Sequence, residues 1–252
     1  MQVHSLTILH YGTDYLSYAL RGVYDSVDKC HVFYTSTPSH GHTTNAPIPE
    51  TRDRLLVAAF AYDPDKKVIW YDMSNVTHEG QQRDTALETV KNAGADIVLV
   101  LDYDEIWHND TLNMFLKHAE ESFVRDYLVN MTHLWRSFNH AIYDEGWPVR
   151  IINLKYNDGV SYIPSTWGHV YHFGYAIRDK IMRYKWEIHG HKNQLRPEWL
   201  DFVWSTAEPD NCHPTNGRNE VGKAFWTAKP FDKMTLPLFM RSHPFYDLER
   251  IE

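Results

Sequence analysis

The chain has few cysteines, no long apolar run and no excess of positive charge. Its two cysteines, Cys30 and Cys212, are too few for a disulfide framework and are compatible with a reducing cytoplasm. No segment reaches the roughly 18 apolar residues of a membrane span. The N-terminus has neither the basic region nor the apolar core of a secretory signal. We therefore expect a cytoplasmic protein without a membrane span.

Acidic residues outnumber basic residues by 33 to 25, so the formal net charge is −8 at pH 7. Such a chain has no long-range attraction to nucleic acid or to an anionic membrane. Hydrophobic residues make up 43% of the 252 residues, which is typical of a globular protein. Without repeats or a linker in the first half, we expect residues 1–252 to form a single domain with a C-terminal elaboration.

The first half alternates short apolar runs with segments of helical periodicity. Strands are expected at 6–11, 29–35, 66–72 and 97–101, and helices after the first strand and at 51–62, 80–94 and 109–124. This alternation predicts an α/β fold whose mostly parallel sheet is flanked by helices on both faces. The last of these helices has an expected buried stripe of Leu112, Phe115, Leu116, Ala119 and Phe123. After residue 125 the rhythm breaks: strands are expected at 126–135, 149–155 and 167–176, and helices at 178–190 and 197–204.

Three carboxylates, Asp102, Asp104 and Glu105, follow the fourth strand directly. Open α/β sheets bind ligands at the carboxyl ends of their strands. Carboxylates this close repel one another, so a divalent cation that also contacts substrate phosphates is an expected partner. The alternative is an acidic loop that caps the next helix, because Asp-x-Asp occurs often by chance.

Residues 80–107, GQQRDTALETVKNAGADIVLVLDYDEIW, look like the core of GT-A glycosyltransferases, especially those similar to glycosyltransferase family 2. Residues 6–27, LTILHYGTDYLSYALRGVYDSV, also resemble the first strand and helix of that family. The resemblance implies a Rossmann-like GT-A fold in which residues 1–107 bind a nucleotide-sugar, with a UDP-sugar as the first choice. It covers the second half only loosely, and residues 108–252 would face the acceptor.

The resemblance also implies roles for single residues. Tyr11 would lie near the nucleotide base and Arg83 would point toward the diphosphate. Asp102 would reach the ribose, the metal or both, and Asp104 would bind the metal, Mn²⁺ or Mg²⁺, directly. From the residues alone, Tyr11 could instead pack in the core, and Arg83 could pair with Glu79 on an exposed helix face.

GT-A enzymes often complete the metal shell with a histidine downstream of the acidic motif. Two segments offer candidates: 167–176 holds His169 and His172, and 185–192 holds His189 and His191. We rank His172 first, then His189 and His191, with a surface or hydrogen-bonded imidazole as the alternative for each. The HFGYA segment is similar to C-terminal segments of GT-A transferases that include viral stand-alone enzymes, for which the compartment would be the host cytoplasm.

An inverting transferase needs a carboxylate that takes the proton of the acceptor hydroxyl. Asp144, Glu145 and Glu187 are candidates because their segments should border the acceptor side, whereas a retaining front-face mechanism would need no such base. Basic residues around one C-terminal helix could bind the leaving diphosphate or form a solvated face: Arg178, Lys180, Arg183, Lys185 and Lys192.

Several acceptors and two other functions stay open. The acceptor could be a glycan, a lipid-linked sugar, a protein or a hydroxymethylated base in DNA, although an acidic chain fits DNA poorly. A nucleotidyltransferase that makes nucleotide-sugars usually has a Gly-rich basic phosphate loop after its first strand, which YGTDYL lacks. The third possibility is a non-catalytic sugar- or metal-binding module on the same scaffold.

Overall fold

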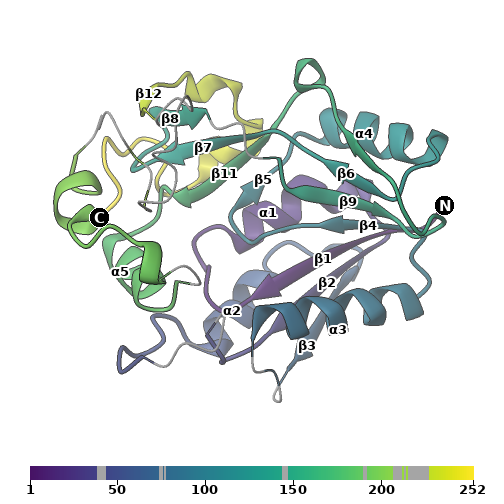
Figure 1. Ribbon diagram of the computed structural model, residues 1–252, viewed down its shortest axis with the longest axis horizontal. Coiled ribbons are helices and arrows are strands. Elements are labelled where there is room, and N and C mark those ends of the chain that lie inside the picture. Colours follow the sequence, from purple (N-terminus) through teal and green to yellow (C-terminus); the bar gives the residue numbers. More distant parts are fainter. Residues whose placement is uncertain are drawn as a thin grey trace.

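The computed structural model describes residues 1–38, 44–73, 76, 78–143, 147–189, 192–206, 212, 214 and 227–252. These residues form a mixed α/β protein with two mixed sheets (Figure 1). Within these ranges, no helix is both long enough and apolar enough to span a bilayer.

The first sheet has the strand order β10-β6-β9-β4-β1-β2-β3. Its strands are β1 (Val3–Leu9), β2 (Lys29–Tyr34), β3 (Val68–Asp72), β4 (Ile97–Val100), β6 (Asp126–Leu128), β9 (Val149–Asn153) and β10 (Val160–Tyr162). The four strands expected in the first half pair in parallel, as do β6 and β10, whereas β9 runs antiparallel to both β4 and β6. The sheet is therefore mixed, and its four first-half strands are parallel as expected.

Helices cover both faces of this sheet (Figure 1). They are α1 (Leu16–Val23), α2 (Arg52–Ala59), α3 (Glu79–Asn92) and α4 (Asn109–Glu121). Because side chains alternate along a strand, Val98 packs with Ala86 and Val90 of α3, whereas Leu99 belongs to the larger core that contains residues of α1 and α4. Burial of these apolar side chains on both faces stabilises the sheet.

The second sheet has the order β12-β8-β7-β11-β5. Its strands are β5 (Glu105–Ile106), β7 (Met131–Trp135), β8 (His140–Tyr143), β11 (Val170–Tyr175) and β12 (Lys229–Pro230), and α5 (Asp179–Glu187) follows β11. The remaining helical segments are short turns at Tyr24–Ser26, Ser165–Trp167, Lys192–Gln194, Trp199–Val203, Lys233–Thr235 and Leu238–Ser242.

Two expectations for the second half are wrong. The single strand expected at 126–135 is two strands, β6 and β7, which belong to different sheets. Apolar residues of the run DYLVNMTHLW continue across the break, so hydrophobicity does not mark it. Phe123 is 84% exposed and outside the buried stripe of α4, because the helix ends at Glu121.

The acidic segment crosses from the first sheet to the second. β4 ends at Val100, and β5 begins at Glu105 and pairs antiparallel with β11. The carbonyl oxygen of Asp104 accepts a hydrogen bond of 2.7 Å from the backbone N–H of Phe173 in β11. The two sheets therefore hold the carboxylates from both sides.

Candidate functional site

A cleft of about 340 Å³ lies at the carboxyl ends of β1 and β4. Because these strands are parallel neighbours, the segments that follow them reach the same edge of the sheet. Residues from both halves of the chain line the cleft. Seven residues that the sequence singled out as binding candidates are among them: Tyr11, Arg83, Asp102, Asp104, His172, Lys185 and His189.

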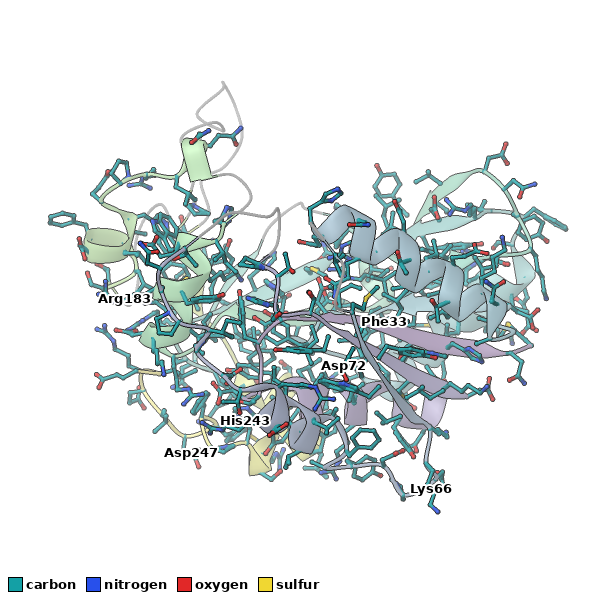
Figure 2. The ribbon with its side chains drawn as sticks, turned by 90° about the horizontal axis from the view of Figure 1, so that it is seen from below. Phe33, Lys66, Asp72, Arg183, His243 and Asp247 are labelled. Atoms are coloured by element: carbon teal, nitrogen blue, oxygen red, sulfur yellow. The ribbon has the colours of Figure 1, made fainter. Side chains whose placement is uncertain are left out.

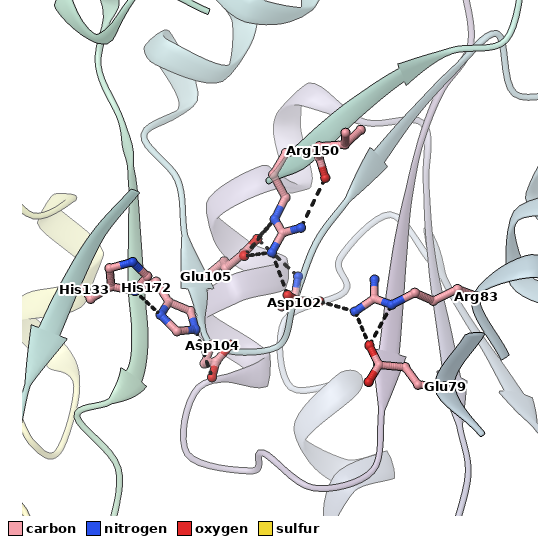
Figure 3. A network of polar contacts seen from close by, with 9 residues as sticks. Glu79, Arg83, Asp102, Asp104, Glu105, His133, Arg150 and His172 are labelled. Carbon is pink, nitrogen blue, oxygen red and sulfur yellow. Dashed lines mark hydrogen bonds and ion pairs between the residues drawn. The ribbon is translucent and has the colours of Figure 1, made fainter. Parts of the chain in front are cut away.

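Arg150 of β9 neutralises two of the three carboxylates (Figure 3). Its Nε donates to both carboxylate oxygens of Glu105, at 2.8 and 2.9 Å, and its Nη2 donates to Asp102 Oδ2 at 2.7 Å. Glu105 is fully buried, and the guanidinium supplies the charge-assisted bonds that such a group requires. The protein itself therefore holds Asp102 and Glu105 together.

Arg83 of α3 joins the same network from the opposite side (Figure 3). Its guanidinium donates to Glu79 one helical turn earlier at 2.7 Å, and its Nη2 lies 3.6 Å from Asp102 Oδ1. The sequence allowed Arg83 either to pair with Glu79 or to face the acidic segment. In the structure it does both, because it pairs with Glu79 and lines the cleft beside Asp102.

Asp104 has a different environment, facing the cleft beside His172. Asp104 Oδ2 lies 3.8 Å from His172 Nε2, which is too long for a hydrogen bond. Burial raises the pKa of Asp104 to about 6 and lowers the pKa of His172 to about 3. At neutral pH the pair is therefore a carboxylate beside a neutral imidazole.

Gly174 leaves space next to these two side chains. A Cβ atom at this position would lie 2.5 Å from His172 Nε2 and 3.1 Å from Asp104 Oδ2. The φ angle of Gly174 is not positive, so its backbone does not require glycine. Any side chain here would instead overlap the His172 ring, so glycine lets His172 and Asp104 lie next to this strand.

A second histidine, His133, contacts the His172 ring at Nδ1, the nitrogen that does not face Asp104 (Figure 3). The two residues are partners in the parallel pairing of β7 and β11, and Glu105 is the partner of His172 on its other side. Their Nδ1 atoms are 2.7 Å apart, with the rings nearly perpendicular. Residues at paired positions face the same side of a sheet, so Glu105, His172 and His133 form a polar row.

Lys185 of α5 adds a second cation to the cleft. Its ammonium group donates to the carbonyl oxygen of Gly174 at 3.2 Å. Its positive charge lowers the pKa of Asp104 and so partly offsets the effect of burial. Other basic residues near this helix lie elsewhere. Arg178 pairs with Asp14 and Glu50, whereas Lys180 and Arg183 are exposed, with Arg183 on the outer side of α5 (Figure 2).

Tyr11 and Tyr103 form the aromatic part of the cleft. Their rings meet edge to face at 5.5 Å, and Tyr103 packs against Gly12, where any Cβ would overlap its ring. Gly12 has a φ of +134°, a conformation that also favours glycine. The Glu50 carboxylate fixes this turn by accepting from the N–H groups of Gly12 and Thr13 at 2.5 and 2.9 Å.

Of the three proposed bases, the structure describes only Glu187. Glu187 is exposed at the end of α5 and is not among the cleft-lining residues, which leaves its role a prediction. Asp144, Glu145 and His191 lie outside the described residues. His189 lines the cleft, whereas His169 lies near His108 and Tyr171, before β11.

Sequence reasoning missed Arg150, His133 and Gly174. Arg150 and His133 each interrupt an otherwise apolar strand, in VRIIN and MTHLW, and a charged or polar residue in a buried strand requires a partner. That signal was present for both. Gly174 gave no such signal, because its effect depends on the side chains on either side of it.

No protein family and no curated protein matches the sequence. In structure, 39 chains of solved proteins match, among them residues 1–349 of S. aureus TarS in complex with UDP, with a TM-score of 0.45 and 13% identity. The likeness covers 75% of this chain and 64% of the TarS chain, so this chain spans less than two thirds of that structure. At this identity and TM-score, the likeness gives no residue here a role.

Proposed function

We propose that the protein is a GT-A glycosyltransferase that transfers a sugar from a nucleotide-diphosphate donor, a UDP-sugar as first choice, to an acceptor hydroxyl. The observation that carries the proposal is the cleft at the ends of β1 and β4. It combines a carboxylate and an imidazole, Asp104 and His172, with two cations, Arg83 and Lys185. The resemblance of residues 6–107 to GT-A transferases supports the same conclusion.

The residues present fit a divalent cation that is shared with a substrate. Among the described residues, no group of three or more His, Cys, Asp or Glu side chains could hold a metal alone. Mg²⁺ and its relatives commonly use one or two protein ligands and complete the shell with water and phosphate oxygens. Asp104 and His172, with the space beside Gly174, would supply those two ligands. The imidazole favours a transition-metal ion such as Mn²⁺ over Mg²⁺.

In the transfer step, the acceptor oxygen would form a bond to the anomeric carbon of the sugar. The bond from that carbon to the diphosphate breaks, its electron pair leaves with the diphosphate oxygen, and the acceptor proton passes to a base. Arg83 and Lys185 would bind the diphosphate and stabilise its growing charge. A bound divalent cation would add to that stabilisation.

Tyr11 and its neighbours would bind the nucleoside. Tyr11 and His10 line the cleft, and His10 Nε2 lies 2.8 Å from the hydroxyl of Tyr184. His10 Nδ1 lies 2.8 Å from the carbonyl of Thr35, so this nitrogen carries the proton and Nε2 accepts from Tyr184. These contacts fix the imidazole ring at the edge of the cleft, where a flat base could stack or pair.

The acceptor is the least constrained part of the proposal. Residues 108–252 would contact it, and candidates are a glycan or another biopolymer, including hydroxymethylated DNA. We also infer that both halves belong to one domain. The main hydrophobic core draws residues from each half, for example Leu99 and Phe173.

The proposal is tested by incubating the protein with a panel of nucleotide-sugars, with and without Mn²⁺, and measuring release of free nucleoside diphosphate. We expect slow Mn²⁺-dependent hydrolysis of one donor, accelerated when the right acceptor is added. Simple glycans and hydroxymethylated DNA serve as the acceptor arms. If no donor is bound or hydrolysed, the transferase function is wrong. Release of pyrophosphate from a nucleoside triphosphate and sugar phosphate would instead indicate nucleotidyltransfer.

A further inference from the structure

His133 and His172 must share one proton. Their Nδ1 atoms are 2.7 Å apart, a hydrogen-bond distance, so one of them carries the hydrogen and the other accepts it. A neutral imidazole has one N–H and one acceptor nitrogen. The choice at Nδ1 therefore decides whether His172 Nε2 presents a hydrogen or a lone pair to the cleft.

The surroundings of His172 Nε2 favour the lone pair. Asp104 Oδ2 is the nearby carboxylate oxygen, and at 3.8 Å it is too far to accept a hydrogen bond from Nε2. Gly174 has no side chain that could contact this nitrogen, and His172 lines the cleft. A lone pair here is suited to a cation, whereas an N–H would have no acceptor within hydrogen-bond distance among the described residues.

We propose that His133 is a positioning residue that accepts the Nδ1 hydrogen of His172 and thereby directs the Nε2 lone pair of His172 toward the cleft beside Asp104. Histidine ligands usually donate their second nitrogen to a carboxylate or a backbone carbonyl, which fixes the tautomer and the ring orientation. Here the imidazole of His133 would be the acceptor in place of a carboxylate or carbonyl. The pairing of β7 with β11 places it, because His133 and His172 are register partners.

This inference rests on the proposed cation site but does not need a nucleotide-sugar to be tested. The first measurement is the tautomer of His172 in the metal-free protein at pH 7, by long-range ¹H–¹⁵N correlation. The His172 signals are assigned from their loss in His172→Asn. We expect the hydrogen on Nδ1; a hydrogen on Nε2 would overturn the proposal.

The second measurement compares two replacements of His133 that are nearly equal in size. Asn can place an acceptor oxygen close to the position of Nδ1, whereas Leu cannot. We expect His133→Asn to keep the tautomer, and His133→Leu to give a mixture of both tautomers. His169→Asn, outside the cleft, is the control and should change neither the tautomer nor the binding of Mn²⁺.

Mn²⁺ alone is the probe for the cation site, followed by paramagnetic broadening of the His172 ring signals. Outer-shell changes typically weaken metal binding by about 10- to 100-fold, so His133→Leu should raise the Mn²⁺ midpoint by at least about 10-fold and His133→Asn by much less. Equal midpoints in the two variants would contradict the positioning role. If Mn²⁺ binds as expected but no donor is hydrolysed, the transferase function fails while the role of His133 stands.

Discussion

Asp102 and Asp104 are separated by one residue, yet their carboxylates lie in opposite electrostatic surroundings. Burial alone would raise the pKa of Asp102, but Arg150 at 2.7 Å and Arg83 at 3.6 Å hold it below its usual value. Burial raises the pKa of Asp104 to about 6, although Lys185 acts in the opposite direction. One carboxylate is balanced by the protein, and the other is left with a charge that costs stability.

This difference gives the carboxylates of the acidic motif separate roles. Asp102 and Glu105 are partners of Arg150 and tie the first sheet to the start of the second. Asp104 points at the cleft with a neutral imidazole beside it. Asp104 has no ion pair with Lys or Arg among the described residues, and a buried carboxylate whose pKa is raised in this way is typical of a ligand-binding position. The comparison can be tested by changing each side separately.

The largest effect should come from neutralising Asp104. Asp104→Asn should abolish Mn²⁺-dependent UDP binding, a loss larger than the roughly 10- to 100-fold of an outer-shell change. Because the pKa of Asp104 is raised from 3.8 to about 6 on folding, its ionisation removes stability as the pH rises between these values. The full cost is present at pH 7, so the same variant should be more stable there, by up to about 3 kcal/mol. Calorimetric titration and thermal unfolding measure the two effects.

Asp102→Asn is the matched control and should have the opposite effect on stability. A carboxyl whose pKa is lowered in the folded state contributes stability above its unfolded value, and this contribution is lost with the amide. We therefore expect a lower unfolding temperature at pH 7. If both variants shift the unfolding temperature in the same direction, the division between the two acids is wrong.

Arg150→Met should be the most damaging change to stability. It leaves Glu105 buried without a partner, which typically costs about 3–5 kcal/mol. The double variant Arg150→Met with Glu105→Leu should recover much of the loss, because no buried charge remains there. Arg83→Met removes the other arginine beside Asp102, but a partly exposed pair contributes only about 0–1 kcal/mol. Chemical denaturation distinguishes the two arginines, and equal losses would contradict the account.

Gly174→Ala should weaken cation binding while the fold is kept. The added Cβ would occupy the space between His172 Nε2 and Asp104 Oδ2. The φ angle allows alanine, but the Cβ would overlap the His172 ring and force it to shift, so we expect a lower unfolding temperature and at least about a 10-fold weaker Mn²⁺ affinity. Gly80→Ala, whose Cβ would meet mainly the ring of His78, is the control. Unchanged Mn²⁺ affinity in Gly174→Ala would place the cation elsewhere.

The smallest effect is the pH dependence of cation binding. A ligand carboxylate must be ionised, so Mn²⁺ affinity should fall by about 10-fold for each pH unit below 6, where Asp104 is protonated. His172 has a pKa of about 3 and stays neutral through this range, so it adds no second transition. Titrating Mn²⁺ at pH 7, 6 and 5 tests this. A loss of affinity centred near pH 4 would indicate that Asp104 is not the titrating ligand.

The first half of the fold could be predicted from the sequence because its signals are local. β1, β2, β3 and β4 are short apolar runs bounded by helices with clear periodicity, and the carboxylates follow the last of them. The cleft at the ends of β1 and β4 follows from parallel pairing of these strands. Asp102 and Asp104 were for this reason expected at this edge of the sheet, and the resemblance to GT-A transferases added Tyr11 and Arg83.

The second half depends on contacts that are distant in the sequence. Arg150 reaches Glu105 across 45 residues, and His133 reaches His172 across 39. Hydrophobicity does not show that β6 and β7 belong to different sheets, because apolar residues continue from one strand to the other. The expectation of a cation bound by Asp102 and Asp104 did not foresee Arg150, which bonds to both Asp102 and Glu105.

The most direct test is a crystal of the protein with UDP and Mn²⁺, measured for the anomalous scattering of manganese. The account predicts one strong peak bonded to both Asp104 Oδ2 and His172 Nε2, with diphosphate oxygens completing the shell and Arg150 still on Asp102 and Glu105. A peak bonded to Asp102 with Arg150 displaced, or UDP bound away from this cleft, would contradict it.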